Sequence, residues 1–379
     1  MSYPTSTPRT TDPILAAVAE ALAGPVVPPA VIACIAPAAS ERQVRDLVEA
    51  VRARGHGASV YDVGNGVITI DGMDDEALDD LVRGNRAIAH VVRAETRYRL
   101  ARREVAPTGT VVRIGGVAFG GRAFPVIAGP CAVEGRSSVM DAARAAAAAG
   151  ASVLRGGAFK PRTSPYDFQG LGLHGAELLA EAGAALGMPV VTEVMSSGAV
   201  EDLYPLTDAF QVGARNMHNF DLLKALGDVD KPVILKRGFA ATVDEWLLAA
   251  EYLLAGGNGR VILCERGIRT FEPRTRFTLD LAAVALAKRE THLPVIVDPS
   301  HATGDPGLVG PMALAAMAAG ADGVMVEVHP DPAEALSDGS QALLPQALAE
   351  LVARLTDVAP AFGRSVTPGP KPRNGRASG

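Results

Sequence analysis

From Phe124 onward the sequence alternates short apolar runs with longer amphipathic stretches, and this alternation constrains the fold more than any other feature. Each apolar run has the length of a buried strand, and each following stretch has the length of an ordinary helix. Eight such β/α units between residues 124 and 358 predict a (β/α)8 TIM barrel. Its strands are expected at 124–128, 152–156, 189–193, 210–213, 232–236, 260–264, 294–298 and 323–328.

An open, doubly wound sheet is the alternative arrangement of alternating strands and helices. That fold usually carries a G-x-G-x-x-G turn directly after its first strand. Here the first predicted strand is followed by Gly129-Pro-Cys131, which does not match this turn. We therefore expect the barrel.

Residues 30–97 carry a shorter pattern that is complete in itself. The turn Gly64-Asn65-Gly66 separates two apolar runs and is typical of a β-hairpin. Ser40 is a favourable N-cap for the first of two helical stretches. The predicted order is βαββαβ, a small ferredoxin-like sandwich, with elements at 31–36, 40–54, 59–63, 66–70, 74–83 and 88–92.

The remaining segments are expected to carry little regular structure. Residues 98–123 form a connector that ends in a short β-hairpin around Gly115-Gly116. Residues 1–29 form an N-terminal extension with one short amphipathic helix from Ile14 to Ala23. Residues 359–379 lack an apolar period and are expected to be a disordered tail.

Composition excludes several classes of protein. A hydrophobic fraction of 48% supplies a large core, and a net charge of −6 argues against nucleic acid or an anionic membrane as a partner. No apolar run reaches the roughly 18 residues that span a bilayer. Cys34, Cys131 and Cys264 lie far apart and form no disulfide framework, so a cytoplasmic location is expected.

Reactive side chains follow the predicted barrel strands. TIM-barrel enzymes build their active sites at the carboxyl ends of the strands. A purely structural barrel would carry mixed polar loops there instead. In this chain every strand end has a charged or nucleophilic side chain: Cys131, Arg155 with Lys160, Glu193, Arg215, Lys236, Glu265 with Arg266, His301 and Glu327.

Some of these residues are of the types that bind metal ions. Cys131, His301 and Glu327, with Asp338 as a further candidate, offer a thiolate, an imidazole and carboxylates suited to a divalent transition ion. Their spacing matches no compact metal motif, but a barrel places its first, seventh and eighth strands side by side. Taken alone, Cys131 is equally well explained as a small buried apolar residue.

A second group near the strand ends is basic. Guanidinium groups bind phosphate and carboxylate in a bidentate manner, and lysine adds a point charge. In a chain of net negative charge, such a group predicts a small phosphorylated acid as the ligand. Scattered surface salt bridges are the alternative explanation. The group consists of Arg155, Lys160, Arg162, Arg215, Lys236 and Arg266.

At these residues the chain resembles the 3-deoxy-7-phosphoheptulonate (DAHP) synthases of type I beta, which carry an N-terminal ferredoxin-like regulatory domain. The resemblance runs from about residue 30 to residue 355 and is most specific in its long motifs. The matching segments are Ala128-Gly-Pro-Cys-Ala-Val-Glu-Gly135, Leu154-Arg-Gly-Gly-Ala-Phe-Lys-Pro-Arg-Thr-Ser-Pro165, Val191-Thr-Glu193, Gln211-Val-Gly-Ala-Arg-Asn216, Leu235-Lys-Arg-Gly-Phe239, Cys264-Glu-Arg-Gly-Ile-Arg-Thr-Phe-Glu272, Val297-Asp-Pro-Ser-His301, Val326-Glu-Val-His-Pro330 and Leu336-Ser-Asp-Gly339.

The resemblance implies an enzyme that condenses phosphoenolpyruvate with erythrose 4-phosphate and water, giving DAHP and phosphate. This reaction is the first step of the shikimate pathway of aromatic amino-acid biosynthesis. The resemblance implies a divalent ion, Mn²⁺ before Co²⁺, Fe²⁺ or Zn²⁺, held by Cys131, His301, Glu327 and Asp338.

The resemblance also implies roles for the remaining site residues. Lys160, Glu193 and His301 are the expected catalytic residues. Arg162 and Thr163 are expected to bind the phosphate group of erythrose 4-phosphate. The expected phosphoenolpyruvate contacts are Arg155, Lys160, Arg215, Lys236 and Arg266, with Glu265 as a further substrate contact.

Other functions compete with this assignment. After His301 the chain reads Ala302-Thr-Gly-Asp-Pro306 where the family carries a basic Gly-Arg-Arg stretch, so the loop geometry near the metal needs a structure. A synthase that uses arabinose 5-phosphate would carry a Lys-Ala-Asn-Arg-Ser-like segment at Lys160-Pro-Arg-Thr163. A Schiff-base aldolase would use Lys236, and a barrel without catalysis would be a regulator or a binding partner.

Feedback control is a further implication of the resemblance. Residues 30–97 would sense Tyr or Phe, and residues 94–108 would act as a hinge that brings this domain across the barrel mouth. A stabilising or oligomerising role for the domain is the alternative. We expect a homo-oligomer, either a tetramer or a dimer.

Overall fold

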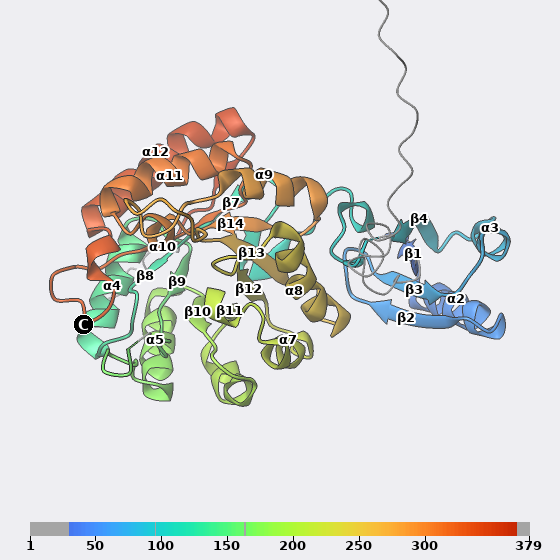
Figure 1. The fold of residues 1–379 in the computed structure, drawn as a ribbon, viewed down its shortest axis with the longest axis horizontal. Coiled ribbons are helices and arrows are strands. Elements are labelled where there is room, and N and C mark those ends of the chain that lie inside the picture. Colours follow the sequence, from blue (N-terminus) through green and yellow to red (C-terminus); the bar gives the residue numbers. More distant parts are fainter. Residues whose placement is uncertain (1–29, 95, 163, 370–379) are drawn as a thin grey trace, which may run out of the picture.

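The computed structural model describes residues 30–94, 96–162 and 164–369. The predicted N-terminal extension with its helix, Thr163 and residues 370–379 of the predicted tail lie outside the described residues. Within them, a small sheet domain is joined through a connector to a larger barrel (Figure 1).

Eight strands close the barrel in the order β10-β11-β12-β13-β14-β15-β8-β9. Neighbouring strands are parallel, and β15 pairs with β8 to complete the ring. The predicted TIM-barrel fold is therefore confirmed. The strands are β8 (Val126–Gly129), β9 (Val153–Arg155), β10 (Val190–Glu193), β11 (Ala209–Val212), β12 (Val233–Lys236), β13 (Val261–Glu265), β14 (Val295–Val297) and β15 (Val324–Glu327).

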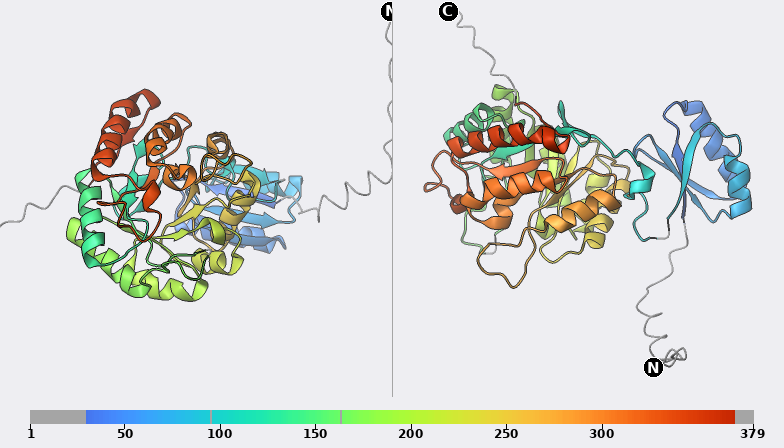
Figure 2. Two further views of the ribbon diagram at one scale, coloured as in Figure 1. Left: turned by 60° about the vertical axis from the view of Figure 1, so that its left-hand side comes forward. Right: turned by 90° about the horizontal axis from the view of Figure 1, so that it is seen from above.

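Helices surround the barrel (Figure 2). Helix α8 begins at a capping box, in which Thr242 and Glu245 each bond the other's backbone N–H. Among the described residues, no helix is long and apolar enough to cross a membrane. The helices are α4 (Arg136–Ala148), α5 (Leu173–Leu186), α6 (Val200–Leu203), α7 (Phe220–Gly227), α8 (Val243–Ala255), α9 (Leu281–Glu290), α10 (Pro299–Thr303), α11 (Pro306–Ala318) and α12 (Pro345–Val358).

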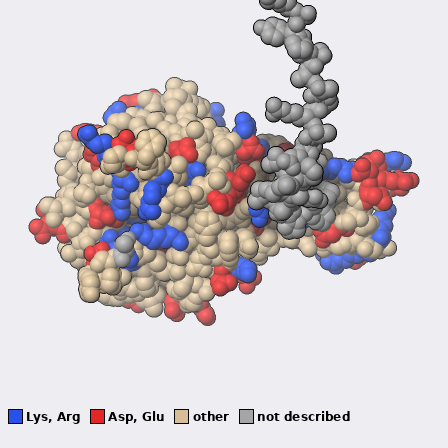
Figure 3. All heavy atoms as spheres, in the orientation of Figure 1, with Lys and Arg blue, Asp and Glu red and all other residues tan. Residues whose placement is uncertain are grey.

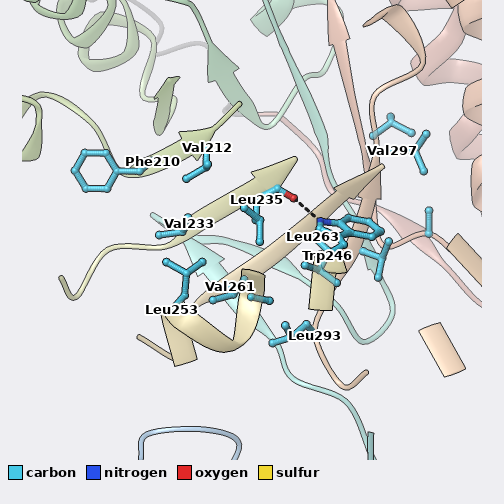
Figure 4. Close-up of a cluster of buried hydrophobic side chains, with 14 of the residues drawn as sticks. Phe210, Val212, Val233, Leu235, Trp246, Leu253, Val261, Leu263, Leu293 and Val297 are labelled. Carbon is cyan, nitrogen blue, oxygen red and sulfur yellow. Dashed lines mark hydrogen bonds between the residues drawn. The ribbon is translucent and has the colours of Figure 1, made fainter. Parts of the chain in front are cut away.

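The main core lies between the strands and these helices. Leu235 and Leu263 point from β12 and β13 toward Trp246 of α8, and all three side chains are fully buried (Figure 4). The indole N–H of Trp246 donates to the carbonyl oxygen of Leu235 at 3.1 Å, so its single polar atom is satisfied inside the core. This bond fixes α8 against β12 directly before Lys236, a predicted site residue.

A β-hairpin closes one end of the barrel. Its strands β5 (Val112–Ile114) and β6 (Val117–Phe119) are antiparallel, as predicted. Ile114 and Phe119 are fully buried and join the cluster of side chains that fills the barrel interior. The hairpin lies at the amino ends of the strands, since a side chain at Gly115 or Gly120 would come within 3.0 Å of Pro189 or 3.5 Å of Pro294, which precede β10 and β14. The carboxyl ends are therefore left as the open mouth.

The N-terminal domain has the predicted βαββαβ order. Its antiparallel sheet has the strand order β2-β3-β1-β4. Helices α2 and α3 bury Leu47, Val51, Leu78 and Leu81 in a cluster on one face of this sheet. The elements are β1 (Ala30–Ile35), α2 (Glu41–Ala53), β2 (Gly57–Tyr61), β3 (Val67–Asp71), α3 (Asp75–Val82) and β4 (Ile88–Ala94).

The connector is bound to the barrel through the backbone of residues 99–101. The Glu251 carboxylate of α8 accepts the backbone N–H groups of Arg99, Leu100 and Ala101 at 2.8, 2.7 and 2.9 Å. Buried His292 also contacts the carbonyl oxygen of Leu100, at 2.8 Å. These bonds hold residues 99–101 against the barrel, so the hinge expected over 94–108 is left to the residues before 99.

The predicted C-terminal tail is ordered as far as residue 369, which corrects its expected start at residue 359. Strand β16 (Ser365–Val366) pairs in parallel with β7 (Ala123–Phe124). Arg364 donates to the carboxylate of Asp322 at 2.9 Å and to the carbonyl oxygens of Gly121 and Gly320. A two-residue strand leaves no periodic signal, so the sequence pattern did not reveal it.

Candidate active site

A cavity of about 260 Å³ opens at the carboxyl ends of the strands. Seven cationic side chains line it against three carboxylates, so its wall is strongly positive although the chain is net negative. Figure 3 shows Lys and Arg side chains gathered on this face of the barrel. The cations are Arg155, Lys160, Arg162, Arg215, Lys236, Arg266 and Arg276.

Beside this cavity lies a cluster of metal-ligand side chains. Cys131 follows β8, Glu327 ends β15 and His301 lies in α10, and one ligand atom from each falls within 4.8 Å of the others. His301 Nε2 lies 3.2 Å from Glu327 Oε1. Asp338 Oδ2 lies 3.2 Å from Cys131 Sγ. Thiol, imidazole and carboxylate donors at these distances fit a divalent ion of borderline softness.

Asp338 reaches this cluster through a special backbone conformation. Among the described residues it is the only non-glycine with a positive φ, at 52°. Asp tolerates this left-handed region better than most residues do. Arg276 binds its other carboxylate oxygen at 3.3 Å. A side chain at the next residue, Gly339, would come within 2.1 Å of the Pro332 carbonyl oxygen, so this turn requires a glycine there.

The charges in the cluster depend on one another. Burial raises the pKa of the Cys131 thiol to about 12, and neighbouring Glu327 adds to this effect. Burial also disfavours the charge on Glu327, but His301 and Arg155 outweigh it and bring its pKa to about 2. Without an ion the pocket thus holds a thiol beside an ionised carboxylate, and a bound cation would favour the thiolate.

The sequence prediction missed Asp298, which joins the metal cluster to the cationic wall. Its fully buried carboxylate accepts from His301 Nδ1 at 2.7 Å and forms an ion pair with Lys236. Burial opposes its ionisation, but His301 and Lys236 outweigh this and hold its pKa well below the usual range. Asp298 therefore orients the ring of a candidate metal ligand and anchors a candidate substrate lysine.

Arg155 and Lys160 connect the cavity to the cluster. Arg155 Nη1 donates to Glu327 Oε1 at 2.7 Å and to the Pro130 carbonyl oxygen at 3.0 Å. Its Nε is buried without a hydrogen-bond partner in the described structure, which suits a site that awaits an anionic ligand. Lys160 Nζ lies 2.9 Å from Cys131 Sγ.

Arg162 reaches the cavity from the loop between β9 and α5. Its Nε donates to the Phe168 carbonyl oxygen at 3.0 Å, and its Nη2 contacts the hydroxyl of Ser337. It therefore lies at the edge of the cavity near Asp338, 4.0 Å from that carboxylate. Its predicted companion Thr163 is outside the described residues.

Glu193 lines the cavity at the end of β10. The side-chain amide of Gln211 donates to its Oε2 at 3.1 Å. A side chain at Gly213 would fall 2.0 Å from Glu193 Oε1, so a glycine is required for this carboxylate to take its position. Glu193 is thus a carboxylate held among cations.

Glu265 does not take the predicted position of a substrate contact. Its carboxylate is fully buried, pairs with Arg237 at 3.0 Å and accepts the backbone N–H of Gly267 at 2.7 Å. Burial raises its pKa in spite of Arg237. The prediction failed because the side chain at the end of a strand can point either into the cavity or into the wall of the barrel. The side chain of Glu265 lies in the wall and stabilises the loop that carries Arg266.

The departure from the family pattern after His301 builds a helix start. Gly304 has a φ of 70°, and the side chain of Asp305 caps α11 by accepting the N–H of Gly307 at 2.8 Å. Pro306 occupies the first helical position, where a missing N–H costs nothing. Asp305 and Pro306 do not line the cavity, so this substitution leaves the positive wall intact.

The fold and this site define a class of protein, a TIM-barrel enzyme whose cationic pocket adjoins a candidate metal cluster. The chain belongs to the DAHP synthetase I family, whose family model matches residues 105–361. The resemblance to the DAHP synthase family seen in its motifs is thereby confirmed.

Relatives of known name agree with this assignment. The phospho-2-dehydro-3-deoxyheptonate aldolase of Thermotoga maritima is 49% identical over 300 residues, 79% of this chain and 89% of that protein. A crystal structure of that aldolase (DAHP synthase) covers 89% of this chain and 100% of its own, with a TM-score of 0.71 and 44% identity. A 2-dehydro-3-deoxyphosphooctonate aldolase from Nitrobacter hamburgensis is more distant, at 35% identity over 65% of this chain and 91% of that protein.

Proposed function

We infer that this chain is a DAHP synthase, which condenses phosphoenolpyruvate with erythrose 4-phosphate and water to give DAHP and phosphate. The observation that carries the inference is the cavity itself. Seven cations there suit two phosphorylated substrates, and the adjoining donors of Cys131, His301 and Glu327 suit an ion that polarises an aldehyde. Formation of DAHP by the purified protein from these two substrates tests the assignment.

Different residues of the cavity are proposed to have different roles in this reaction. Arg155, Lys236 and the arginines of the wall bind the anionic groups of phosphoenolpyruvate and hold its methylene carbon facing the aldehyde. A new carbon–carbon bond forms between these two atoms, water adds to the former enol carbon, and the bond to the phosphate oxygen breaks. Lys160, which contacts Cys131, is proposed to give a proton to the aldehyde oxygen, and Glu193 in the cavity wall is proposed to take one from the water.

The ion is proposed to be Mn²⁺, with Co²⁺, Fe²⁺ or Zn²⁺ as substitutes, held by Cys131, His301, Glu327 and Asp338. When bound, it would supply Lewis-acid chemistry to the aldehyde. The mixed sulfur, nitrogen and oxygen donors support a transition ion over Mg²⁺ or Ca²⁺, which prefer oxygen ligands. We also propose a cytoplasmic location, since Cys34, Cys131 and Cys264 are all free thiols.

The two anion pockets are expected to separate in steady-state kinetics. Arg162→Ala should raise the KM for erythrose 4-phosphate by about tenfold or more, because a lost charged hydrogen bond costs roughly 1.5–3 kcal/mol. Arg215→Ala should raise the KM for phosphoenolpyruvate instead. Arg136→Ala removes an exposed arginine paired with Glu181 and serves as the neutral control. The same single-substrate defect in both cavity variants would contradict the division.

The N-terminal domain is proposed to sense Tyr or Phe, in a homo-oligomer that is a tetramer or a dimer. Its place beside the amino ends of the barrel strands constrains this role. Asp62 lies 4.0 Å from Arg260, which precedes β13, so the domain contacts the barrel far from the mouth. Movement relative to the barrel must then occur before Tyr98, since the next residues are bound to Glu251.

Truncation should separate regulation from catalysis. A chain that starts at Thr96 is expected to keep its turnover and lose inhibition by Tyr or Phe. A chain that starts at Thr108 should be unstable, because Glu251 would lose three hydrogen bonds worth about 1.5–3 kcal/mol each. Thermal unfolding and inhibition assays on both chains check this. If the full-length enzyme ignores Tyr, Phe and Trp alike, the domain has a structural role.

A further inference from the structure

Two phenylalanines form part of the cavity wall among the cations. Phe239 follows β12 and Phe277 lies in the loop between β13 and α9, and both line the cavity. Their rings stack with centroids 5.0 Å apart and planes inclined by 7°. The two rings carry no charge, so their place in a wall lined by seven cations requires an explanation.

Arginine side chains lie over these rings. The guanidinium carbon of Arg266 is 4.2 Å from the Phe277 centroid and 5.0 Å from the Phe239 centroid. The guanidinium carbon of Arg215 is 5.2 Å from the Phe239 centroid. All three distances lie within the range of cation–π attraction. Phe239 therefore contacts two arginines that reach the cavity from different strands.

Arg266 differs from the other buried cations of the barrel, whereas Arg215 is exposed at the cavity mouth. Arg155, Lys236 and Arg237 are each paired with a carboxylate. Within the described part of the chain, Arg266 has no carboxylate within 4.0 Å although it is only 4% exposed. Its hydrogen bonds go to the carbonyl oxygens of Gly267 and His301, at 3.4 and 3.2 Å. Burial lowers its pKa to about 10.

An aromatic face and a carboxylate stabilise a guanidinium in different ways. A carboxylate offsets its charge and takes up some of its N–H groups, so less of both is left for a ligand. A ring face attracts the cation while leaving its charge and its outward N–H groups available. Rings in place of a carboxylate thus keep a buried arginine in one position and still able to bind an anion.

We propose that Phe239 and Phe277 form an aromatic platform that positions Arg215 and Arg266 for the anionic groups of phosphoenolpyruvate. The proposal rests on the proposed function for the identity of that substrate. The platform acts through the two arginines and touches no reacting atom, so its members are positioning residues. Phosphoenolpyruvate affinity should depend on the rings, and erythrose 4-phosphate affinity should not.

Phe239→Leu tests the platform, since leucine keeps apolar bulk and removes the π face. The KM for phosphoenolpyruvate should rise about fivefold to thirtyfold, the range between an exposed and a desolvated cation–π contact. The kcat and the KM for erythrose 4-phosphate should stay within about twofold, because the contact is the same in the ground and transition states. Phe239→Tyr, which keeps the ring, should restore the KM.

Phe220→Leu is the matched control. Phe220 stacks on Tyr252 with centroids 4.7 Å apart, but this pair lies on α7 and α8 and does not line the cavity. Its replacement should leave both KM values unchanged. Phe277→Leu should also raise the KM for phosphoenolpyruvate. In this variant the effect would come from Arg266 alone, which lies over the Phe277 ring.

Calorimetric titration with inorganic phosphate separates failure of the platform from failure of the proposed function. Should the wild type make no DAHP, phosphate binding should still weaken about fivefold to thirtyfold in Phe239→Leu and remain unchanged in Phe220→Leu. The platform is refuted if phosphate binds both variants equally well. The platform is also refuted if Phe239→Leu raises the KM values for phosphoenolpyruvate and erythrose 4-phosphate alike. It is refuted as well if Phe239→Tyr fails to restore the KM for phosphoenolpyruvate. A general packing role would give these results.

Discussion

Cys131→Ala is expected to lower turnover by about a thousandfold or more, because the loss of Lewis-acid assistance costs several kcal/mol of transition-state stabilisation. Cys131 Sγ lies next to Asp338 and within ligand reach of His301 and Glu327, so no other described thiol can replace it there. Chelation of the wild-type enzyme should have the same effect, and Mn²⁺ or Co²⁺ should reverse it. Activity with and without added ion measures both.

Cys264→Ala provides the control for this experiment. Cys264 is also buried in the barrel, but it belongs to the apolar interior cluster and not to the metal cluster. Its loss should cost some stability while leaving the response to metal unchanged. Full activity of Cys131→Ala that resists chelation would contradict the proposed metal site.

Asp298→Asn is expected to weaken metal binding by about 10–100-fold, the usual cost of losing the partner that orients a ligating histidine. Asparagine keeps the shape but not the charge, so the fit to both His301 and Lys236 is lost. Lys236 is only 4% exposed and would be left without its carboxylate. The KM for phosphoenolpyruvate should therefore rise as well.

Asp305→Asn is the matched control for Asp298→Asn, since it lies nearby in the chain and asparagine is an equally good N-cap for α11. Titration of each variant with Mn²⁺, followed by calorimetry and by activity, makes the comparison. An unchanged metal affinity in Asp298→Asn would show that His301 does not depend on this carboxylate.

The fold could be predicted because its signal is local. Most barrel strands are short runs rich in Val, Ile and Leu that are buried on both faces, and the helices between them have lengths and patterns of their own. The βαββαβ order of the small domain was also readable, since the Gly64-Asn65-Gly66 turn and the Ser40 cap mark its elements. Such signals do not depend on distant parts of the chain.

The candidate site was only partly predictable. The rule that barrel sites lie at strand ends identified Arg155, Lys160, Glu193, Lys236 and His301, all of which line one cavity. Asp298 and the aromatic platform were missed because their roles come from contacts between segments far apart in the sequence. Asp298 is the last residue of the strand predicted at 294–298. This position at a strand end was the available signal for its role.

Three features that the sequence pattern did not reveal share one physical cause. Glu265, the connector around Leu100 and the C-terminal segment around Arg364 are all held by hydrogen bonds of charged side chains that are buried or partly buried. Apolar periodicity indicates which hydrophobic side chains are buried, and it gives no information about such bonds. A carboxylate that collects three backbone N–H groups, as Glu251 does, orders a segment that has no apolar pattern.

Product formation from phosphoenolpyruvate is the measurement that tests the central claim most directly. The metal-stripped protein should be assayed with erythrose 4-phosphate and, separately, with arabinose 5-phosphate, before and after addition of Mn²⁺. We expect DAHP and inorganic phosphate in equal amounts, only with erythrose 4-phosphate and only with the ion present. A preference for arabinose 5-phosphate, or no turnover with either sugar phosphate after addition of the ion, would contradict the assignment.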